Sequence, residues 1–344
     1  MDMSNTRIVI LGKTGAGKSS LANTIFGEKH FAINNTANSG TTECQAKTKS
    51  VSGRSITLID TPGFFDTDKS EEELKPEILR CITRCAPGPH AFLIVLKVDK
   101  FTEQEKELIS KINEYFSEEV FKYATLVFTN GEQLPEGEKI QDFVHKNKSL
   151  SDLVKKCGGR CHVVDNKYWK ERSESEYRSN RFQVKELLKT IHNTILANKG
   201  GCYTNEMLQA VEEAIQQEEQ HIRQSGGNML ATEIREQARN TVSKRLLNKL
   251  AGIVTGALLG GFFGWKRGRD LAQLGRSVVA AGGGTGEAIG KVLAILTVIS
   301  TTLVGAGMGA VRGKEAAEGA HTPWEAASRA AAAVTTNEVL GINQ

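Results

Sequence analysis

Several features that mark common protein classes are missing from this sequence. It carries no basic patch interleaved with aromatic residues and its net charge is only +4, which speaks against a nucleic-acid partner. The stretch before Arg7 is short and polar, so no secretory signal peptide is expected. Its six cysteines include the pairs Cys81/Cys85 and Cys157/Cys161, but no histidine set completes a zinc site. These absences predict a cytoplasmic protein with reduced thiols.

A phosphate-binding loop is the most informative motif that is present. Residues 12–19 read Gly-Lys-Thr-Gly-Ala-Gly-Lys-Ser and follow an apolar run at 7–11 that is expected to be a strand. Glycines allow the tight turn that points backbone N–H groups at one anion, and the helix expected next adds its N-terminus. Lys18 is expected to bind the β- and γ-phosphates, and Ser19 to ligate Mg²⁺. The predicted phosphate-binding residues are Gly12, Lys13, Thr14, Gly15, Ala16, Gly17, Lys18, Ser19 and Ser20.

A second motif supplies the metal side of the predicted site. An apolar strand ends in the Asp-Thr-Pro-Gly turn at 60–63. Asp60 is expected to hold Mg²⁺ through water, and Gly63 to give its N–H to a γ-phosphate. In the polar stretch 34–44, Thr41 is the first choice for a switch threonine that ligates Mg²⁺, and Thr42 is the second. A solvated loop without metal contact is the alternative for this stretch.

The base-reading motif differs from the Asn-Lys-x-Asp sequence of many GTPases. Here an apolar strand runs into Thr129-Asn130-Gly131-Glu132, and a later strand ends in Asn166. A carboxylate at Glu132 fits the N1–H and exocyclic amine of guanine, whereas adenine lacks that donor pair. Asn166 is expected at the same sheet edge, where its amide reaches the base. The alternative for both Glu132 and Asn166 is an ordinary turn residue.

These motifs together carry a family resemblance. The stretches 12–20, 60–67, 88–93 and 128–132 are similar to the GTPases of immunity-associated proteins (GIMAP), a group related to septins and to chloroplast import-receptor GTPases. The resemblance covers about residues 5–220. It implies GTP or GDP binding, nucleotide-controlled dimerisation through the nucleotide face and attachment to intracellular membranes. It also implies that Glu132 reads guanine and that Asn166 is the base-side asparagine.

Hydrolysis is less well supported by the residues than binding. Phe64 follows Gly63 where small Ras-like GTPases carry the glutamine that orients the attacking water. No arginine is clearly placed as a finger, with Arg54, Arg80 and Arg84 as the open alternatives. His90 is a weak candidate for handling water, and a structural histidine is the alternative. The sequence therefore predicts slow intrinsic turnover and leaves the catalytic residue unknown.

Alternating strands and helices through residue 200 predict an α/β fold, a doubly wound and mostly parallel sheet of the P-loop GTPase type. Charged residues then dominate 201–250, which predicts one or two long helices with a break near Ser225. The expected organisation is a G domain at 5–200, a charged helical extension at 201–250 and a Gly/Ala-rich region at 251–344. Helices are expected at 17–26, 71–86, 103–121, 138–156 and 180–197.

The C-terminal region carries glycine at every fourth position in three runs, at 252–268, 282–290 and 305–313. This spacing is typical of a glycine-zipper contact between membrane helices. The stretch 292–311 is uncharged over 20 residues, and Leu250–Trp265 is similar but shorter. Together they predict membrane association through 250–313, with a soluble or disordered glycine-rich tail as the alternative.

The sequence as a whole predicts a guanine-nucleotide switch that binds Mg²⁺ with GTP or GDP. Slow or assembly-dependent hydrolysis would control a homodimer or oligomer on an intracellular membrane such as ER, Golgi or lipid droplet. The alternative function is a catalytically near-inert, GTP-dependent membrane scaffold, and an ATPase of similar fold is a third reading.

Overall fold

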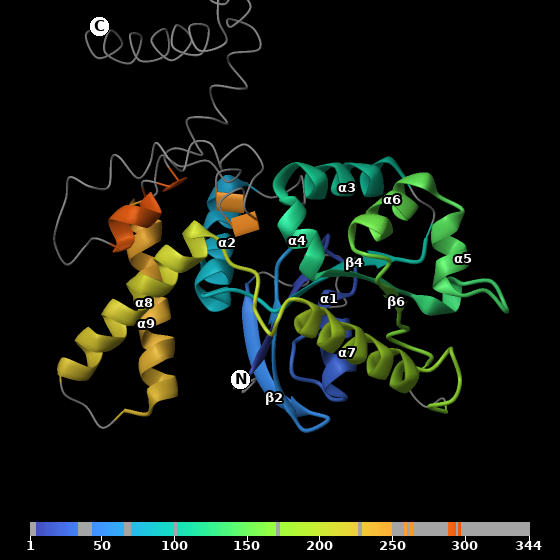
Figure 1. Ribbon diagram of the computed structural model, residues 1–344, viewed down its shortest axis with the longest axis horizontal. Coiled ribbons are helices and arrows are strands. Elements are labelled where there is room, and N and C mark those ends of the chain that lie inside the picture. The colour runs from blue at the N-terminus through green and yellow to red at the C-terminus, as the bar shows by residue number, and fades with distance from the viewer. Residues whose placement is uncertain are drawn as a thin grey trace, which may run out of the picture.

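A computed structural model describes residues 5–33, 43–64, 70–99, 102–169, 173–225 and 229–249. It also describes the short pieces 258–259, 262–263, 288–293 and 295–296. Figure 1 shows how the elements are arranged, with helices α8 and α9 forming a hairpin at one side of the central sheet.

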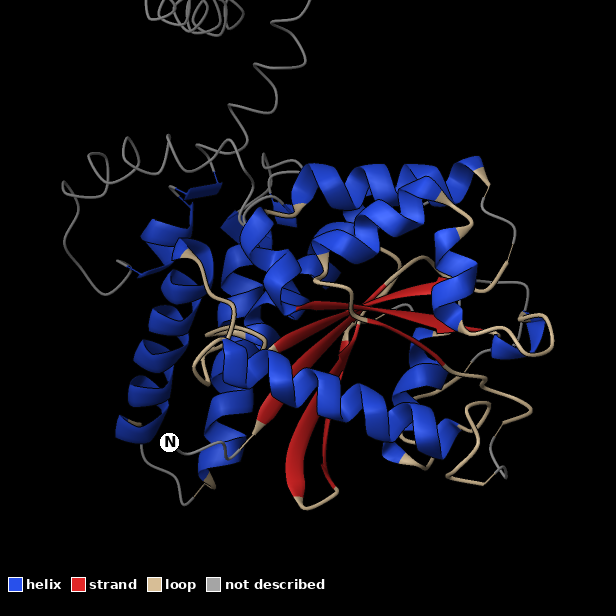
Figure 2. Cartoon of the chain, turned by 45° about the vertical axis from the view of Figure 1, so that its right-hand side comes forward, coloured by secondary structure: helices blue, strands red, loops and turns tan. Residues whose placement is uncertain are grey.

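One mostly parallel sheet forms the centre of the described chain. Its strand order is β2-β3-β1-β4-β5-β6, and only β2 runs antiparallel to its neighbour β3. Figure 2 shows this sheet between two groups of helices. The strands are β1 (Thr6–Leu11), β2 (Gln45–Val51), β3 (Arg54–Asp60), β4 (Ala91–Lys97), β5 (Ala124–Thr129) and β6 (Cys161–Val163).

Helices cover both faces of the sheet and create two apolar clusters. Helices α1 and α7 pack on one face, where their leucines and isoleucines meet Ile8, Ile10 and Val95 of the sheet. The second cluster surrounds Phe92, Ile94 and Phe128 on the other face. The helices on the first face are α1 (Lys18–Phe26) and α7 (Asn180–Ala197). The helices of the second cluster are α2 (Glu71–Cys85), α3 (Glu103–Tyr115), α4 (Glu118–Tyr123), α5 (Ile140–His145) and α6 (Lys148–Lys156), together with α8 (Glu206–Gln224) and α9 (Ala231–Lys249), which pack on α2.

The expected fold class, α/β with a mostly parallel sheet and a helical C-terminal part, is confirmed. Two expected helices are each divided, and the predictions of single helices at 103–121 and 138–156 were wrong. The first divides because Phe116 is extended and fully buried, and the backbone N–H of Ser117 donates to the carbonyl oxygen of Phe263 at 3.1 Å. The second divides where the Asn147 side chain accepts from the N–H of Leu150 at 3.1 Å and begins α6. Strand β2 was not predicted.

The α8–α9 hairpin packs beside α2, as Figure 1 shows. Arg235 of α9 contacts both Glu212 and Glu219 of α8, with a distance of 2.7 Å from nitrogen to oxygen in each pair. Arg84 of α2 pairs with Glu236 of α9 at 3.1 Å. These pairs join the hairpin internally and to the helix that follows the Asp-Thr-Pro-Gly turn.

Parts of the expected membrane segments lie inside the protein. Phe262 and Phe263 are fully buried, and Phe263 lies 4.1 Å from Phe116 between ring centroids. Both rings also contact Phe92 of β4, at 6.3 and 6.1 Å. Further on, Lys291 Nζ lies 2.9 Å from a Glu213 carboxylate oxygen of α8. The rest of the glycine runs falls outside the described residues.

Among the described residues, no helix is both long enough and apolar enough to cross a bilayer.

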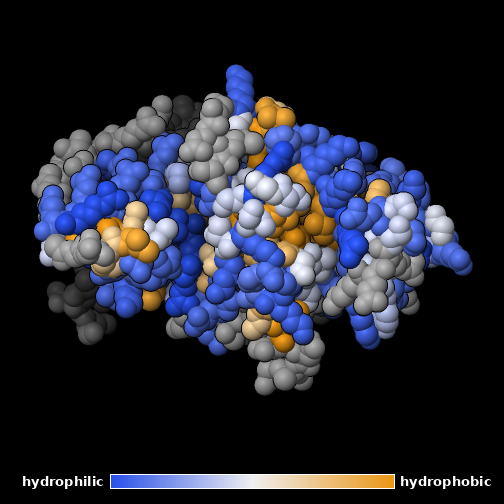
Figure 3. Space-filling model, turned by 90° about the horizontal axis from the view of Figure 1, so that it is seen from below, coloured by the Kyte–Doolittle hydropathy of each residue, from blue (hydrophilic) through white to orange (hydrophobic). Residues whose placement is uncertain are grey.

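Hydrophobic side chains are exposed at the end of the α8–α9 hairpin, where Met229 and Leu230 are 39% and 67% exposed (Figure 3).

Candidate functional site

The phosphate loop lies between the end of β1 and the start of α1. Gly17 precedes α1 with a left-handed backbone, φ +90°, and caps the helix without a side-chain hydrogen bond. The first N–H groups of α1 therefore face outward and can bind an anion. The Lys18 ammonium donates to the carbonyl oxygens of Gly12 and Lys13, both at 2.9 Å. Its charge is thereby held over the loop.

The start of α1 and the end of β3 bring the two expected metal residues, Ser19 and Asp60, together. Ser19 Oγ donates to Asp60 Oδ2 at 2.5 Å, and Thr61 Oγ1 donates to the Ile10 carbonyl oxygen at 2.7 Å. Asp60 is 1% exposed, and its Oδ1 has no hydrogen-bond partner among the described residues. Burial raises the pKa of this carboxyl above its ordinary value. A hydroxyl beside an unsatisfied carboxylate oxygen fits the oxygen ligands that Mg²⁺ prefers.

The base side of the site is tied to the phosphate loop by Thr129 and Asn166. Thr129, the last residue of β5, donates through Oγ1 to the Ala16 carbonyl oxygen at 2.8 Å. Asn166 Oδ1 accepts from Thr24 Oγ1 of α1 at 3.1 Å. A Cβ at Gly17 would lie 3.0 Å from Asn166 Nδ2 and 3.1 Å from Thr129 Cγ2. Glycine therefore allows the base-side residues to approach the loop closely.

Glu132 lies on a short 3-10 turn, η1 (Gly131–Gln133), directly after β5. The turn begins after Asn130, whose backbone is left-handed with φ +60°. Glu132 Oε2 is buried and has no hydrogen-bond partner among the described residues. Burial first, and the neighbouring Asp165 carboxylate second, raise the pKa of Glu132. An unsatisfied carboxylate oxygen is available here for a ligand with N–H donors.

Three residues of this region were missed by sequence reasoning. Asp165 accepts from the N–H groups of Glu132 at 3.2 Å and of Lys167 at 2.8 Å, and also from that of Tyr168. Asn180 holds the Asp165 peptide from α7, and Trp169 packs on Gly131. The available signals were an acidic residue at the end of a strand and a tryptophan in an otherwise polar loop.

A family model described as the AIG1 family matches residues 6–223. The chain belongs to the AIG1 family. This confirms the family that the motifs predicted, and the AIG1 match extends through the phosphate loop, the base-side turn and α8.

Individual relatives support the same assignment. The AIG1 chain is 34% identical to GTPase IMAP family member 8 of Mus musculus over 196 residues, which is 56% of this chain and 27% of that protein. It is 31% identical to Immune-associated nucleotide-binding protein 7 of Arabidopsis thaliana over 219 residues, which is 62% of this chain and 68% of that protein. The chain thus spans about a quarter of the mouse relative.

Among solved structures, Toc33 from Arabidopsis thaliana in complex with GDP and Mg²⁺ is similar to the AIG1 chain. The TM-score is 0.44 at 20% identity, over 56% of this chain and 85% of that chain.

His90 precedes β4 and lies at the opposite end of the strands from the phosphate loop. Its N–H donates to the Arg7 carbonyl oxygen at 2.8 Å, and its Nδ1 accepts from the Arg7 N–H at 3.0 Å. Arg7 opens β1, whereas the loop follows the end of β1. We therefore assign the His90 imidazole a structural role.

The other residues considered for hydrolysis are also engaged elsewhere. The Phe64 side chain is buried in the apolar core after Gly63, which is itself buried. Arg80 pairs with Glu77 at 2.9 Å. Arg84 contacts α9, and Arg54 begins β3 at its far end from Asp60. Thr41 and Thr42 lie outside the described residues.

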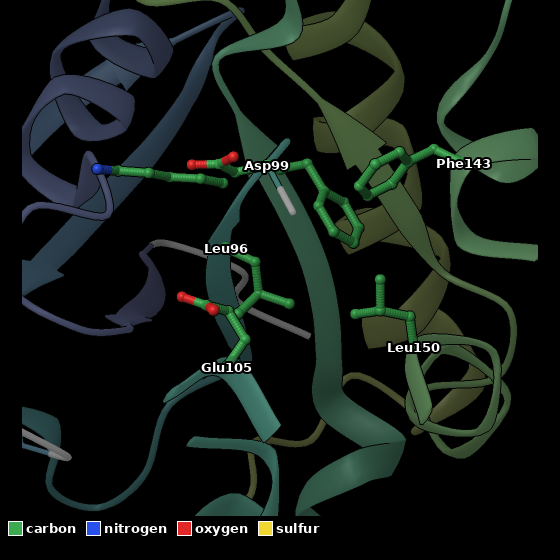
Figure 4. A pocket seen from close by; sticks show the side chains of 7 residues that line it. Leu96, Asp99, Glu105, Phe143 and Leu150 are labelled. Atoms are coloured by element: carbon green, nitrogen blue, oxygen red, sulfur yellow. The ribbon is translucent and has the colours of Figure 1, made fainter. Parts of the chain in front are cut away.

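A small pocket lies beside the ends of β4 and β5, but it contains none of the predicted site residues (Figure 4). Asp99 and Glu105 provide its acidic groups, and Phe143 and Leu150 its apolar wall. It does not coincide with the candidate site formed by the phosphate loop and Asp60.

Proposed function

We propose that this AIG1 protein is a guanine-nucleotide-binding switch that binds Mg²⁺ with GTP or GDP and hydrolyses GTP slowly. The observation that carries the proposal is that one sheet edge joins the phosphate loop, Asp60 and Glu132. The Ser19–Asp60 hydrogen bond joins the start of α1 to the end of β3, and the Thr129–Ala16 hydrogen bond joins the end of β5 to the phosphate loop. The names of the relatives, a GTPase and a nucleotide-binding protein, agree with it.

Each residue of the loop has a distinct part in the proposed binding. Backbone N–H groups from Gly12 to Ser20 surround the phosphates, and Lys18 exchanges its carbonyl partners for phosphate oxygens. Ser19 and Asp60 would hold Mg²⁺, with Thr41 as the proposed third ligand. The metal ion neutralises phosphate charge when bound.

The base is read by the turn after β5. The buried Glu132 Oε2 without a partner accepts from guanine, and Asn166, which accepts from Thr24 of α1, lies next to the phosphate loop. Adenine does not offer the N1–H and exocyclic amine donors together. GTP is therefore preferred to ATP in this proposal.

A near-inert scaffold is the second candidate function, and the burial of Phe64 favours it. The phenyl ring is 4% exposed and cannot orient an attacking water by hydrogen bonding. In the first candidate a second copy activates hydrolysis at the nucleotide face. In the second, GTP only holds the assembled state.

We further propose that the G domain at 5–200 carries the nucleotide, the extension at 201–250 couples to α2, and 251–344 meets an intracellular membrane. The pairing of Arg84 with Glu236 supports the coupling. The membrane part rests only on the uncharged and glycine-spaced sequence. The described pieces at 262–263, 288–293 and 295–296 contribute buried side chains to the protein and do not support it.

Calorimetry tests the site. Lys18→Ala should abolish measurable GTP binding, because a buried phosphate partner is lost. The exposed lysine Lys148 on α6 provides the control, since Lys148→Ala should leave the affinity unchanged. Unchanged GTP affinity in Lys18→Ala would overturn the assignment.

Phosphate release separates the two candidate functions. Turnover per molecule that rises steeply with protein concentration supports an assembly-activated enzyme. A flat trace near zero across the same range supports the scaffold.

A further inference from the structure

We propose that Asp165 is the specificity-positioning residue of the base site: it fixes Glu132 and thereby sets the preference for guanine over hypoxanthine. This inference rests on the proposed function, because it assumes that Glu132 reads the base. It assigns a role to a buried acid that the sequence motifs do not include.

The geometry ties the two base-side segments together through Asp165. Its Oδ2 accepts from the Glu132 N–H at 3.2 Å, while its Oδ1 accepts from the Lys167 N–H at 2.8 Å. The Gly131 N–H donates to the Val164 carbonyl oxygen at 3.1 Å, one residue before Asp165. The backbone that carries the Glu132 side chain is therefore held from the loop after β6.

Asp165 is itself held rigidly. Its N–H donates to Asn180 Oδ1 at 3.0 Å, and Asn180 Nδ2 donates to its carbonyl oxygen at 2.5 Å. Both partners are buried, with Asp165 fully so and Asn180 5% exposed. Because Asn180 begins α7, the position of Glu132 is set by a helix packed on the sheet, not by a surface loop.

The charge of Asp165 also acts on Glu132. Burial opposes the ionisation of Asp165, but hydrogen bonds from Glu132, Tyr168 and Lys167 outweigh it and lower its pKa. Burial and the ionised carboxylate of Asp165 beside it both favour the neutral form of Glu132 and so raise its pKa. The other groups facing this pair are the Lys167 ammonium and the Gln133 amide, which donates to Glu132 Oε1 at 3.4 Å.

Guanine and hypoxanthine differ only in the exocyclic amine. A well-placed carboxylate accepts from both N1–H and the amine of guanine, but only from N1–H of hypoxanthine. If the Glu132 carboxylate is displaced, it loses one of its two hydrogen bonds to the guanine of GDP. The affinity for IDP, which offers only N1–H, changes little. The GDP/IDP affinity ratio therefore reports the position of Glu132, whereas general loosening of the loop lowers both affinities equally.

The test measures GDP and IDP affinity by calorimetry in the full-length chain for Asp165→Asn. We expect GDP affinity to fall about tenfold and the GDP/IDP ratio to shrink about fivefold, the size of one charge-assisted hydrogen bond. Asp152→Asn, at an exposed position on α6, is the matched control and should leave the ratio unchanged. Thermal unfolding of each variant reports the integrity of the fold.

A double-mutant cycle shows whether Asp165 acts through Glu132. In a Glu132→Gln background, Asp165→Asn should no longer change the ratio. Equal losses for GDP and IDP in Asp165→Asn, or the same ratio change with and without Glu132, would overturn the inference.

The pH profile of GDP binding gives a readout that also works on the unaltered protein. Guanine must replace any proton on Glu132, so wild-type GDP affinity should fall as the pH drops through the raised pKa of Glu132. In Asp165→Asn that fall should move to lower pH. A pH-independent wild-type affinity down to the ordinary range of a glutamate contradicts the inference. If wild type does not prefer GDP to IDP and Glu132→Gln changes nothing, the proposed guanine reading fails instead.

Discussion

The ring of Trp169 packs directly against Gly131, so closely that a Cβ at position 131 would lie 2.6 Å from Cη2 and 2.9 Å from Cζ2. Trp169 is 1% exposed and follows β6, whereas Gly131 follows β5. This contact explains why a side chain is absent immediately before Glu132. It couples the turn that carries Glu132 to the apolar core.

Gly131→Ala should therefore destabilise the protein by about 1–3 kcal/mol, because the methyl group overlaps the buried indole. The midpoint and slope of urea unfolding measure the change in the free energy of unfolding. Adding Trp169→Phe removes the overlapping part of the ring and should recover part of the loss. If Gly131→Ala unfolds like wild type, the close packing at this position is not rigid.

The Ser19–Asp60 contact predicts a magnesium-dependent effect on nucleotide affinity. Ser19→Ala removes a hydroxyl that would ligate the ion, so the gain in GTP affinity on adding Mg²⁺ should shrink by about tenfold or more. Titration of a fluorescent GTP analogue with and without a chelator measures this gain. Wild type and variant should bind with similar affinity in the chelator, which serves as the internal control. An undiminished Mg²⁺ effect would remove Ser19 from the metal site.

His90 predicts a loss of stability in acid. Burial, helped by the charge of Arg7, lowers the pKa of His90 from 6.5 to about 4. The His90 imidazole therefore binds a proton more readily in the unfolded chain than in the folded protein. The contribution of neutral His90 to the free energy of unfolding is complete above about pH 6.5 and is lost as the pH falls toward 4. His162, whose pKa is also lowered to about 4 by burial, acts in the same direction.

His90→Asn keeps an acceptor for the Arg7 N–H but removes the titration. Urea midpoints measured from pH 7 to pH 4 should fall less steeply than in wild type, with the His162 contribution left in place. The same variant should hydrolyse GTP at the wild-type rate, since residue 90 lies at the far end of the sheet. A large drop in turnover would restore His90 as a catalytic candidate.

The contacts of Phe263 predict that the described piece at 262–263 stabilises the sheet and the helices packed on it. Phe263→Ala should cost about 3–5 kcal/mol of unfolding free energy, because the fully buried ring contacts Phe92, Phe116 and Phe262. Leu230→Ala, at a 67% exposed position, is the matched control and should change stability by less than about 0.5 kcal/mol. Equal, small effects for the two variants would mean that Phe263 does not stabilise the domain.

Much of the candidate site could be predicted from the sequence, because its motifs are local. A phosphate loop needs glycines, a lysine and a hydroxyl within one turn, and its flanking strand and helix show as apolar patterns nearby. The same holds for Asp60 at the end of a strand, and for helix α7, whose bounds were predicted correctly at 180–197. The family followed from these motifs.

The sequence by itself thus determined the mostly parallel fold, the phosphate loop and the acids expected beside it, because short-range backbone geometry and periodicity encode them. Only the tertiary structure decided that Asp165 and Trp169 contact the turn at 131–133, and that His90 lies at the opposite end of the sheet from the phosphate loop. It also decided that Ser117 donates to Phe263 and ends a predicted helix. The physical reason is that these features depend on which distant residues share a buried contact, and burial leaves no local pattern in the chain.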